Sequence, residues 1–197
     1  MNADDRRLIS DALQGRSAAF GELVLRYQDR LYNAVLRVTD NPDDALDVVQ
    51  DAFVNAYQSL KSFKGDAEFY TWLYRIAFNT AVSLKRKRRL VVSLDAGRDG
   101  ESGVDPEDHC EDRPGVALQR SEDEALLQAA LNRISAEHRI VLVLKDIEGM
   151  KYEQIAEVLG VPIGTIRSRL HRARLELRDV ISPGSAAQDS PVEGVEN

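Results

Sequence analysis

The sequence predicts an all-α fold of two small helical modules joined by a flexible acidic linker. Apolar residues recur at spacings of three and four in both halves of the chain, whereas no segment shows the period of two typical of half-buried strands. Between the halves, the segment 93–115 is rich in Gly, Pro, Asp, Glu and Ser and has neither period. A length of 197 residues leaves room for one ordinary domain or two small ones.

The formal net charge of −7 is unevenly distributed along the chain. Residues 1–90 hold 14 Lys and Arg against 12 Asp and Glu, residues 125–181 hold 9 against 7, and residues 91–124 hold 3 against 11. So acidic and polar a segment cannot bury enough apolar surface to offset the entropy lost on ordering. The sequence therefore predicts a first module over residues 1–92, a linker over 93–120, a second module over 121–181 and a disordered tail over 182–197.

Several kinds of protein are disfavoured by composition. No run approaches the ~20 apolar residues of a membrane span, and the N-terminus lacks the apolar core of a signal peptide. The single cysteine, Cys110, excludes an internal disulfide or a multi-cysteine metal site. Beside His109 it could serve a redox or metal role, but a solvated residue in an acidic loop is the favoured interpretation. We therefore expect a cytoplasmic protein with no cofactor and no metal.

A helix is predicted from residue 42, because Asn41 is a good cap and Pro42, Asp43 and Asp44 suit the positive end of a helix. Its predicted buried stripe is Ala45, Leu46, Val49, Ala52, Phe53, Ala56 and Leu60. Its predicted exposed row is Asp44, Asp47, Asp51, Asn55 and Gln58. The stretch DDALD also matches the DDxxD pattern of prenyl synthases, but the second acidic cluster that such enzymes need is missing from the sequence, so a face for a basic partner or for water is favoured.

The segment 69–89 is predicted to be a second helix with an aromatic and basic character. Phe69, Trp72, Leu73, Ile76 and Ala77 can turn inward, and Trp72 is interpreted as a core residue. The predicted outer face carries Arg75, Asn79, Ser83 and Arg86, with Thr71 and the edge aromatics Tyr74 and Phe78. Five basic residues, 85–89, end the helix. Aromatic rings beside a row of basic residues are typical of a site for single-stranded DNA, because unpaired bases stack on the rings while the basic side chains contact the phosphate backbone.

The second module ends in a predicted helix-turn-helix. Its helices, MKYEQIAEVL and IGTIRSRLHRARLELR, are separated by Gly160, Val161 and Pro162, with Pro162 expected in the first turn of the second helix. The core stripe is predicted to be Ile163, Ile166, Leu170, Ala173 and Leu177. Off it lie Arg167, Arg169, Arg172, Arg174 and Arg178. We expect the start of this helix to face base edges and its later arginines to follow phosphates, the alternative being a solvated basic face.

These segments together resemble one protein family. FGELVLRYQDRLYNAVLRV, DALDVVQDAFVNAYQSLKSFKGDAEFYTWLYRIAFNTA and YEQIAEVLGVPIGTIRSRLHRARLEL resemble the extracytoplasmic-function sigma factors of bacterial RNA polymerase, in the branch of the envelope-stress sigma-E. The resemblance covers both helical modules, in order. It implies a stress-response transcription initiation factor, not an enzyme, that binds core polymerase, opens the minus-10 element with its first module and reads the minus-35 element with its second.

The resemblance also implies roles for particular residues. Asp47, Gln50 and Asp51 correspond to the stretch that meets the clamp helices of the largest polymerase subunit, and the second module to the part that meets the flap. The loop 62–69 corresponds to the one that captures a flipped minus-10 base. The candidate minus-10 residues are Phe63, Phe69, Tyr74, Asn79, Ser83 and Arg86. The candidate minus-35 residues are Thr165, Arg167, Ser168, His171 and Arg172.

The match is imperfect at two positions, and some alternatives stay open. Ser83 stands where sigma-E-type proteins often have asparagine, and His171 where an apolar or aromatic residue is common. The resemblance places the linker in a basic polymerase channel, whereas its acidity alone is also explained by a solvated tether. An anti-sigma factor is a further partner that it allows. A helix-turn-helix regulator that never joins polymerase and a DDxxD enzyme are the rival interpretations.

Overall fold

The structure is a computed structural model that describes residues 2–95 and 114–182, with side chains for 2–81, 83 and 123–182. Helices are the regular elements of these residues and no strand occurs among them, which confirms the predicted all-α class. Most of the predicted linker and tail, including His109 and Cys110, lies outside the described residues. No helix in the described part has the length and apolar character needed to cross a membrane.

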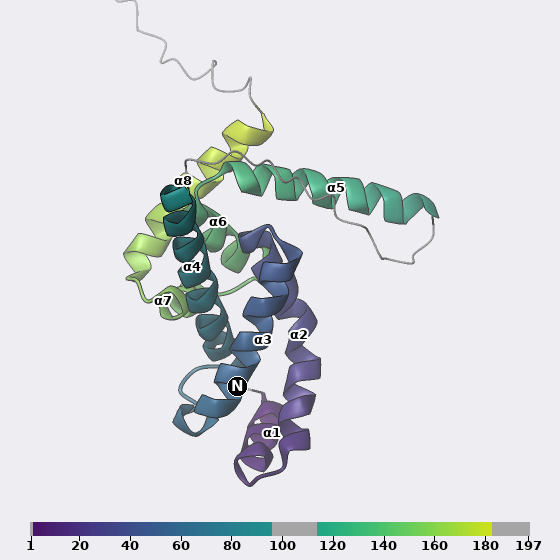
Figure 1. The fold of residues 1–197 in the computed structure, drawn as a ribbon, viewed down its shortest axis with the longest axis vertical. Coiled ribbons are helices and arrows are strands. Elements are labelled where there is room, and N and C mark those ends of the chain that lie inside the picture. The colour runs from purple at the N-terminus through teal and green to yellow at the C-terminus, as the bar shows by residue number, and fades with distance from the viewer. Residues whose placement is uncertain (1, 96–113, 183–197) are drawn as a thin grey trace, which may run out of the picture.

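The first module contains four α-helices. They are α1 (Ala3–Leu13), α2 (Ser17–Thr39), α3 (Pro42–Ser59) and α4 (Phe69–Asp95), with the short 3₁₀ turn η1 (Leu60–Ser62) after α3. Helix α2 packs against α1, α3 and α4, and α3 also packs against α4 (Figure 1). The loop after η1 joins α3 to α4 and is the segment expected to capture a base.

The second module is built from α5 to α8. They are α5 (Pro114–Arg133), α6 (Ala136–Leu142), a π-helical turn η2 (Val143–Ile147) that continues α6, α7 (Tyr152–Leu159) and α8 (Ile163–Ile181). Helix α8 packs against α5, α6 and α7. Because α4 runs to Asp95 and α5 begins at Pro114, helices occupy both ends of the range 93–120 that the sequence assigns to the linker.

The cap predicted for α3 is present. The side chain of Asn41 accepts a hydrogen bond from the Asp44 backbone N–H at 2.9 Å, and Pro42 occupies the first helical position. Asn41→Ala is expected to lower the free energy of unfolding by about 1 kcal/mol, measured by chemical denaturation, because this amide would lose its partner. Asn55→Ala, an exposed change within the same helix, is the matched control and should not destabilise the protein. Equal effects of the two changes would contradict the capping role.

The buried stripe of α3 differs from the prediction at its edges. Leu46, expected in the core, is 59% exposed, whereas Val48, not expected there, is fully buried. Asp44, expected in the exposed row, is 7% exposed. The rest of the predicted stripe is buried, and Asp47, Asp51, Asn55 and Gln58 are exposed as predicted.

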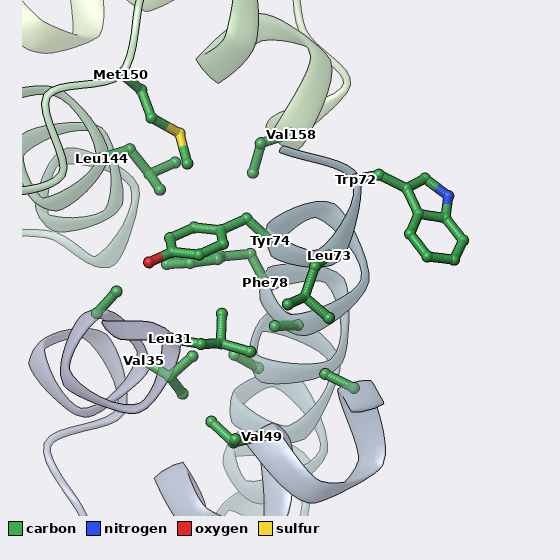
Figure 2. Close-up of a cluster of buried hydrophobic side chains, with 14 of the residues drawn as sticks. Leu31, Val35, Val49, Trp72, Leu73, Tyr74, Phe78, Leu144, Met150 and Val158 are labelled. Carbon is green, nitrogen blue, oxygen red and sulfur yellow. The ribbon is translucent and has the colours of Figure 1, made fainter. Parts of the chain in front are cut away.

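Helix α4 is buried on two faces, which the sequence does not predict. Phe69, Trp72, Leu73 and Ala77 are buried as expected, and Ile76, predicted with them, is half-buried. Tyr74 and Phe78, expected at the outer edge, are 0% and 1% exposed, and Thr71 is also buried. Figure 2 shows the stacked rings of Tyr74 and Phe78 between α2 residues Leu31 and Val35 and the second-module residues Leu144 and Met150. The placement of these side chains on the outer face was therefore wrong, because α7 packs against α4, and Leu144 and Met150 of the second module lie beside the two rings.

Candidate nucleic-acid interface

The turn between α7 and α8 has the geometry of a tight helix-turn-helix. Gly160 ends α7 with φ 64°, a left-handed conformation that glycine adopts without a steric penalty, and its N–H donates to Ala156 O. Pro162 is the residue before α8 and not, as predicted, within its first turn. Its carbonyl accepts from the backbone N–H of Thr165 at 2.9 Å and of Ile166 at 3.2 Å, which starts the helix.

One line of α8 anchors the helix in the second module. Ile166, Leu170 and Ala173 are at most 2% exposed, and Leu177 is half-buried, as the stripe predicts. Ile163 is 36% exposed, because it lies at the free start of the helix. The opposite line faces solvent. It carries four of the predicted minus-35 residues, Arg167, Ser168, His171 and Arg172, while Thr165 beside them is half-buried.

The five arginines of α8 fall into two groups that the sequence does not distinguish. Arg169 pairs with Glu137 at 2.7 Å, Arg174 with Asp146 at 2.6 Å and Arg178 with Asp179 at 3.2 Å. These guanidinium groups are at least partly neutralised within the chain. The expectation that the later arginines follow the phosphates therefore applies poorly to Arg174 and Arg178, which have carboxylate partners already.

Arg167 and Arg172 form the second group. Both are exposed, and neither forms an ion pair with a residue that the structure describes. The Arg167 guanidinium lies over the Tyr152 ring at 5.8 Å from its centroid, and Lys145 Nζ lies 5.0 Å from the same ring. Such cation–π contacts orient a guanidinium while leaving its donors available for another partner. Arg167 and Arg172 are thus the α8 cations with the most freedom to bind an external anion or base.

The candidate minus-10 residues do not all lie on one surface. Asn79 and Ser83 are exposed, and the Ser83 hydroxyl donates to the Asn79 carbonyl at 2.8 Å. Arg75 is exposed one turn before Asn79, so these three form an outward line on α4. Phe63 is half-buried at the edge of the loop, whereas Phe69 and Tyr74 are wholly buried. The side chain of Arg86 lies outside the described residues.

An aromatic cluster supports Phe63. Its ring centroid lies 5.0 Å from that of Trp72 and 5.9 Å from that of Phe69, the latter in an edge-to-face arrangement. Trp72 is 7% exposed, which confirms it as a core residue. Phe69 therefore lies behind Phe63, and only Phe63 of the two has a surface that a base could reach in this arrangement.

The candidate polymerase-binding residues Asp47, Gln50 and Asp51 are exposed together on α3. Exposed apolar side chains border these residues. Leu46 had been predicted in the core, and no prediction was made for Val54 or Tyr57. Leu46, Val54 and Tyr57 are 59%, 48% and 48% exposed. This mixed face, of carboxylates beside exposed apolar groups, is typical of a protein-binding surface. Val54, an apolar residue off the predicted stripe, was a sequence signal for this face, whereas Leu46 had been predicted to be in the core.

The described residues contain no group of three or more His, Cys, Asp and Glu side chains that could hold a metal ion. In DDALD, Asp44 points into the module while Asp47 points to solvent. These carboxylates therefore do not converge as a shared ligand set would require.

The geometry defines a two-module DNA-binding protein with a helix-turn-helix in its second module. Family models of sigma-70 region 2 and sigma-70 region 4 match residues 23–91 and 124–177. The chain is 38% identical over 184 residues to the RNA polymerase sigma-H factor of Pseudomonas aeruginosa, covering 91% of this chain and 94% of that protein. It is 36% identical over 189 residues to the ECF RNA polymerase sigma-E factor of Escherichia coli K12, covering 91% and 95%.

Solved structures agree with these relatives. The fold is similar to that of CnrH in its complex with the cytosolic domain of CnrY, with a TM-score of 0.67, 29% identity, and coverage of 92% of this chain and 99% of that one. It is equally similar to the sigma factor RpoE in complex with the anti-sigma factor NepR from Bartonella quintana, with a TM-score of 0.67, 29% identity, and coverage of 83% and 96%. The chain belongs to the sigma-70 family, in the extracytoplasmic-function group, and is a transcription initiation factor.

Proposed function

We propose that this sigma factor divides initiation among three exposed surfaces. The face of α3 around Asp47, Gln50 and Asp51 binds the clamp helices of the largest polymerase subunit. The exposed line of α8 reads the minus-35 element. The loop 62–69 and the outward line of α4 engage the minus-10 strand as it opens. The supporting observation is that the two sigma-70 regions match the two modules of one chain, in order.

The partners follow from this division of surfaces. Core RNA polymerase and promoter DNA are the main ones, with the flap region meeting the second module. An anti-sigma factor is a further partner, by analogy with the RpoE complex with NepR. Acting with polymerase places the protein in the cytoplasm, and we expect no enzymatic activity of its own.

In vitro transcription with purified core polymerase and a promoter library tests the proposal. The protein should direct transcripts whose start points share minus-35 and minus-10 sequences. A helix-turn-helix regulator, the rival interpretation, would bind promoter fragments without core polymerase and would not support transcription. That outcome would replace the proposal with the rival.

Arg167 and Arg172 are expected to divide the reading of the minus-35 element. A bidentate contact between arginine and guanine discriminates by about 1–3 kcal/mol, whereas a phosphate contact weakens all sequences alike. Substituting the base-reading arginine with alanine should flatten promoter preference, and substituting the other should lower affinity uniformly. Binding to a minus-35 library is the measurement. Arg174→Ala is the matched control, because Asp146 already holds that side chain, and the assignment of α8 is wrong if all three variants match the parent.

A further inference from the structure

A buried carboxylate lies in the core stripe of α1. Asp5, Leu8, Ile9 and Ala12 follow one another at spacings of three, one and three, which places them on one face of the helix, and all four are at most 7% exposed. A carboxylate in such a place is costly unless it is paired and hydrogen-bonded. The hydrophobic effect accounts for the three apolar residues of this face, but it does not account for Asp5.

Both oxygens of Asp5 are held by neighbouring side chains of α2. The Arg26 Nη1 donates to Asp5 Oδ1 at 2.5 Å, and the Tyr27 hydroxyl donates to Asp5 Oδ2 at 2.7 Å. Arg26 balances the charge from the surface, since its side chain is 36% exposed whereas that of Asp5 is 5% exposed. Burial, followed by the hydrogen bond to Asp5, raises the pKa of Tyr27, so its hydroxyl keeps the proton that it donates. The carboxylate therefore fixes the hydroxyl end of the Tyr27 side chain.

The Tyr27 ring is the first of three aromatic rings that lead to the loop 62–69. Its centroid lies 5.7 Å from that of Phe69, and the Phe69 centroid lies 5.9 Å from that of Phe63. Both distances are typical of aromatic pairs in contact. Helix α1 also packs against η1, the turn directly before Phe63, and Figure 1 shows α1 and this loop at the same end of the first module. We refer to Tyr27, Phe69 and Phe63 as the ring series.

The ring series can carry a displacement from α1 to the loop. Protein interiors are packed as densely as organic crystals, so a buried ring in contact with two others does not shift without moving them. Phe69 is 0% exposed between Tyr27 and Phe63, and Phe63 is half-buried at the edge of the loop. A binding site keeps its geometry only where the residues behind it are themselves fixed by packing and hydrogen bonds. The place of the Phe63 ring therefore depends on what holds Tyr27.

We propose that Asp5 is a positioning residue for base capture: by holding the Tyr27 hydroxyl it fixes the ring series, and so the place of Phe63 in the loop 62–69. The inference rests on the proposed function for what Phe63 does, whereas the position of the ring series is a property of the free chain. Asp5 is 3% exposed and acts through Tyr27, not by touching the strand. Helix α1, which lies outside the three surfaces proposed for initiation, thereby contributes to the binding of the minus-10 strand.

Two substitutions break the contact with little change in volume. Tyr27→Phe removes only the hydroxyl, and Asp5→Asn leaves one of the two donors facing an amide N–H in place of an oxygen. Asp11→Asn is the matched control, because it makes the same change on the same helix and weakens a 2.6 Å ion pair with Arg16. The circular dichroism spectrum and the unfolding temperature of all three variants are recorded, so that a loss of fold is not mistaken for a displaced ring.

The single tryptophan of the chain reports on the ring series in the free protein. Trp72 lies 5.9 Å from Phe69 and 5.0 Å from Phe63, measured between ring centroids. Tyr27→Phe and Asp5→Asn should shift the Trp72 emission or raise its quenching by acrylamide, because the rings beside it move. The control variant should leave the emission and the quenching as they are in the parent.

Binding of the holoenzyme to the single-stranded minus-10 element is the second readout, measured by fluorescence anisotropy on a strand from a promoter that the library selects. Each nucleotide in turn is made abasic, and the captured base is the one whose removal leaves Phe63→Ala without further effect. Tyr27→Phe and Asp5→Asn should bind the intact strand about tenfold more weakly, within the range that one base stacked on an aromatic ring contributes. They should bind the strand that lacks the captured base as the parent does, whereas a general loss of fold would weaken both strands.

The outcomes separate the inference from the proposed function. The inference is overturned if Tyr27→Phe and Asp5→Asn leave Trp72 and strand binding unchanged, or if they weaken the intact and the abasic strands alike. It is also overturned if Trp72 responds while Phe63→Ala alone weakens the intact strand. If Trp72 responds and Phe63→Ala binds every strand as the parent does, Asp5 still positions the ring series and the proposed role of the loop is wrong.

Discussion

Reversing the charge of both Asp47 and Asp51 is expected to abolish association with core polymerase. The two side chains are exposed one turn apart on α3, in the face that we propose for the clamp helices. Lysines there would place like charges across a complementary interface, which costs several kcal/mol and lowers the association rate as well as the affinity. Co-elution with core polymerase on gel filtration and a binding titration by fluorescence anisotropy are the measurements.

The matched control reverses Glu153 and Glu157, two exposed carboxylates with the same spacing on α7. That variant carries the same change in net charge but leaves α3 intact, so it should retain most of the affinity for core polymerase. Both double variants should keep the circular dichroism spectrum of the parent. The docking assignment is contradicted if the Asp47 and Asp51 variant binds core polymerase as the parent does, or if the control loses binding to the same degree.

Most of the buried interior of α3 could be predicted from spacing alone, but the edges of its stripe could not. Leu46 and Phe53 are seven residues apart, about two helical turns, so they lie on nearly the same line of α3. Yet Leu46 is 59% exposed and Phe53 is 7% exposed. The difference comes from α2, whose Phe20 ring lies 6.5 Å from that of Phe53. The spacing of apolar residues within one helix does not show which neighbouring helix will cover a residue at the edge of the stripe.

The same limit explains the largest error in the candidate site. Tyr74 and Phe78 lie off the predicted stripe of α4, so spacing placed them outside, although one side of the ring pair faces Leu31 and Val35 on α2. The other side of the ring pair is covered by Leu144 and Met150, which are about 70 residues further along the chain. The α8 arginines show it again, because Arg169 and Arg174 are paired with Glu137 and Asp146 on other segments. The residue types in the sequence therefore predicted the function. Which aromatic side chains are exposed and which arginines are unpaired depends on packing, and only the structure shows it.

Opening of the minus-10 element is expected to depend on Asn79 and Phe63. A flipped base loses stacking worth a few kcal/mol and must regain it from a fitted pocket. Phe63 offers an accessible aromatic ring at the loop, and Asn79 offers amide donors and acceptors on the outward line of α4. Asn79→Ala and Phe63→Ala should therefore reduce open complexes, detected by permanganate reactivity of unpaired thymines, more than they reduce closed-complex binding.

Templates already melted by a mismatched bubble around minus-10 separate base capture from strand opening. Such a template removes the cost of unpairing but still presents a base to the pocket, so both variants should be rescued only in part. Phe63→Ala also removes the contacts of the Phe63 ring with Phe69 and Trp72. The unfolding temperature of this variant therefore has to be measured beside its activity. Asn79→Ala avoids that difficulty, because the Ser83 hydroxyl donates to the Asn79 backbone carbonyl, which alanine keeps. Full rescue of Asn79→Ala on the bubble template would show that the amide assists opening without holding a base, and the pocket would then have to be sought elsewhere on the loop.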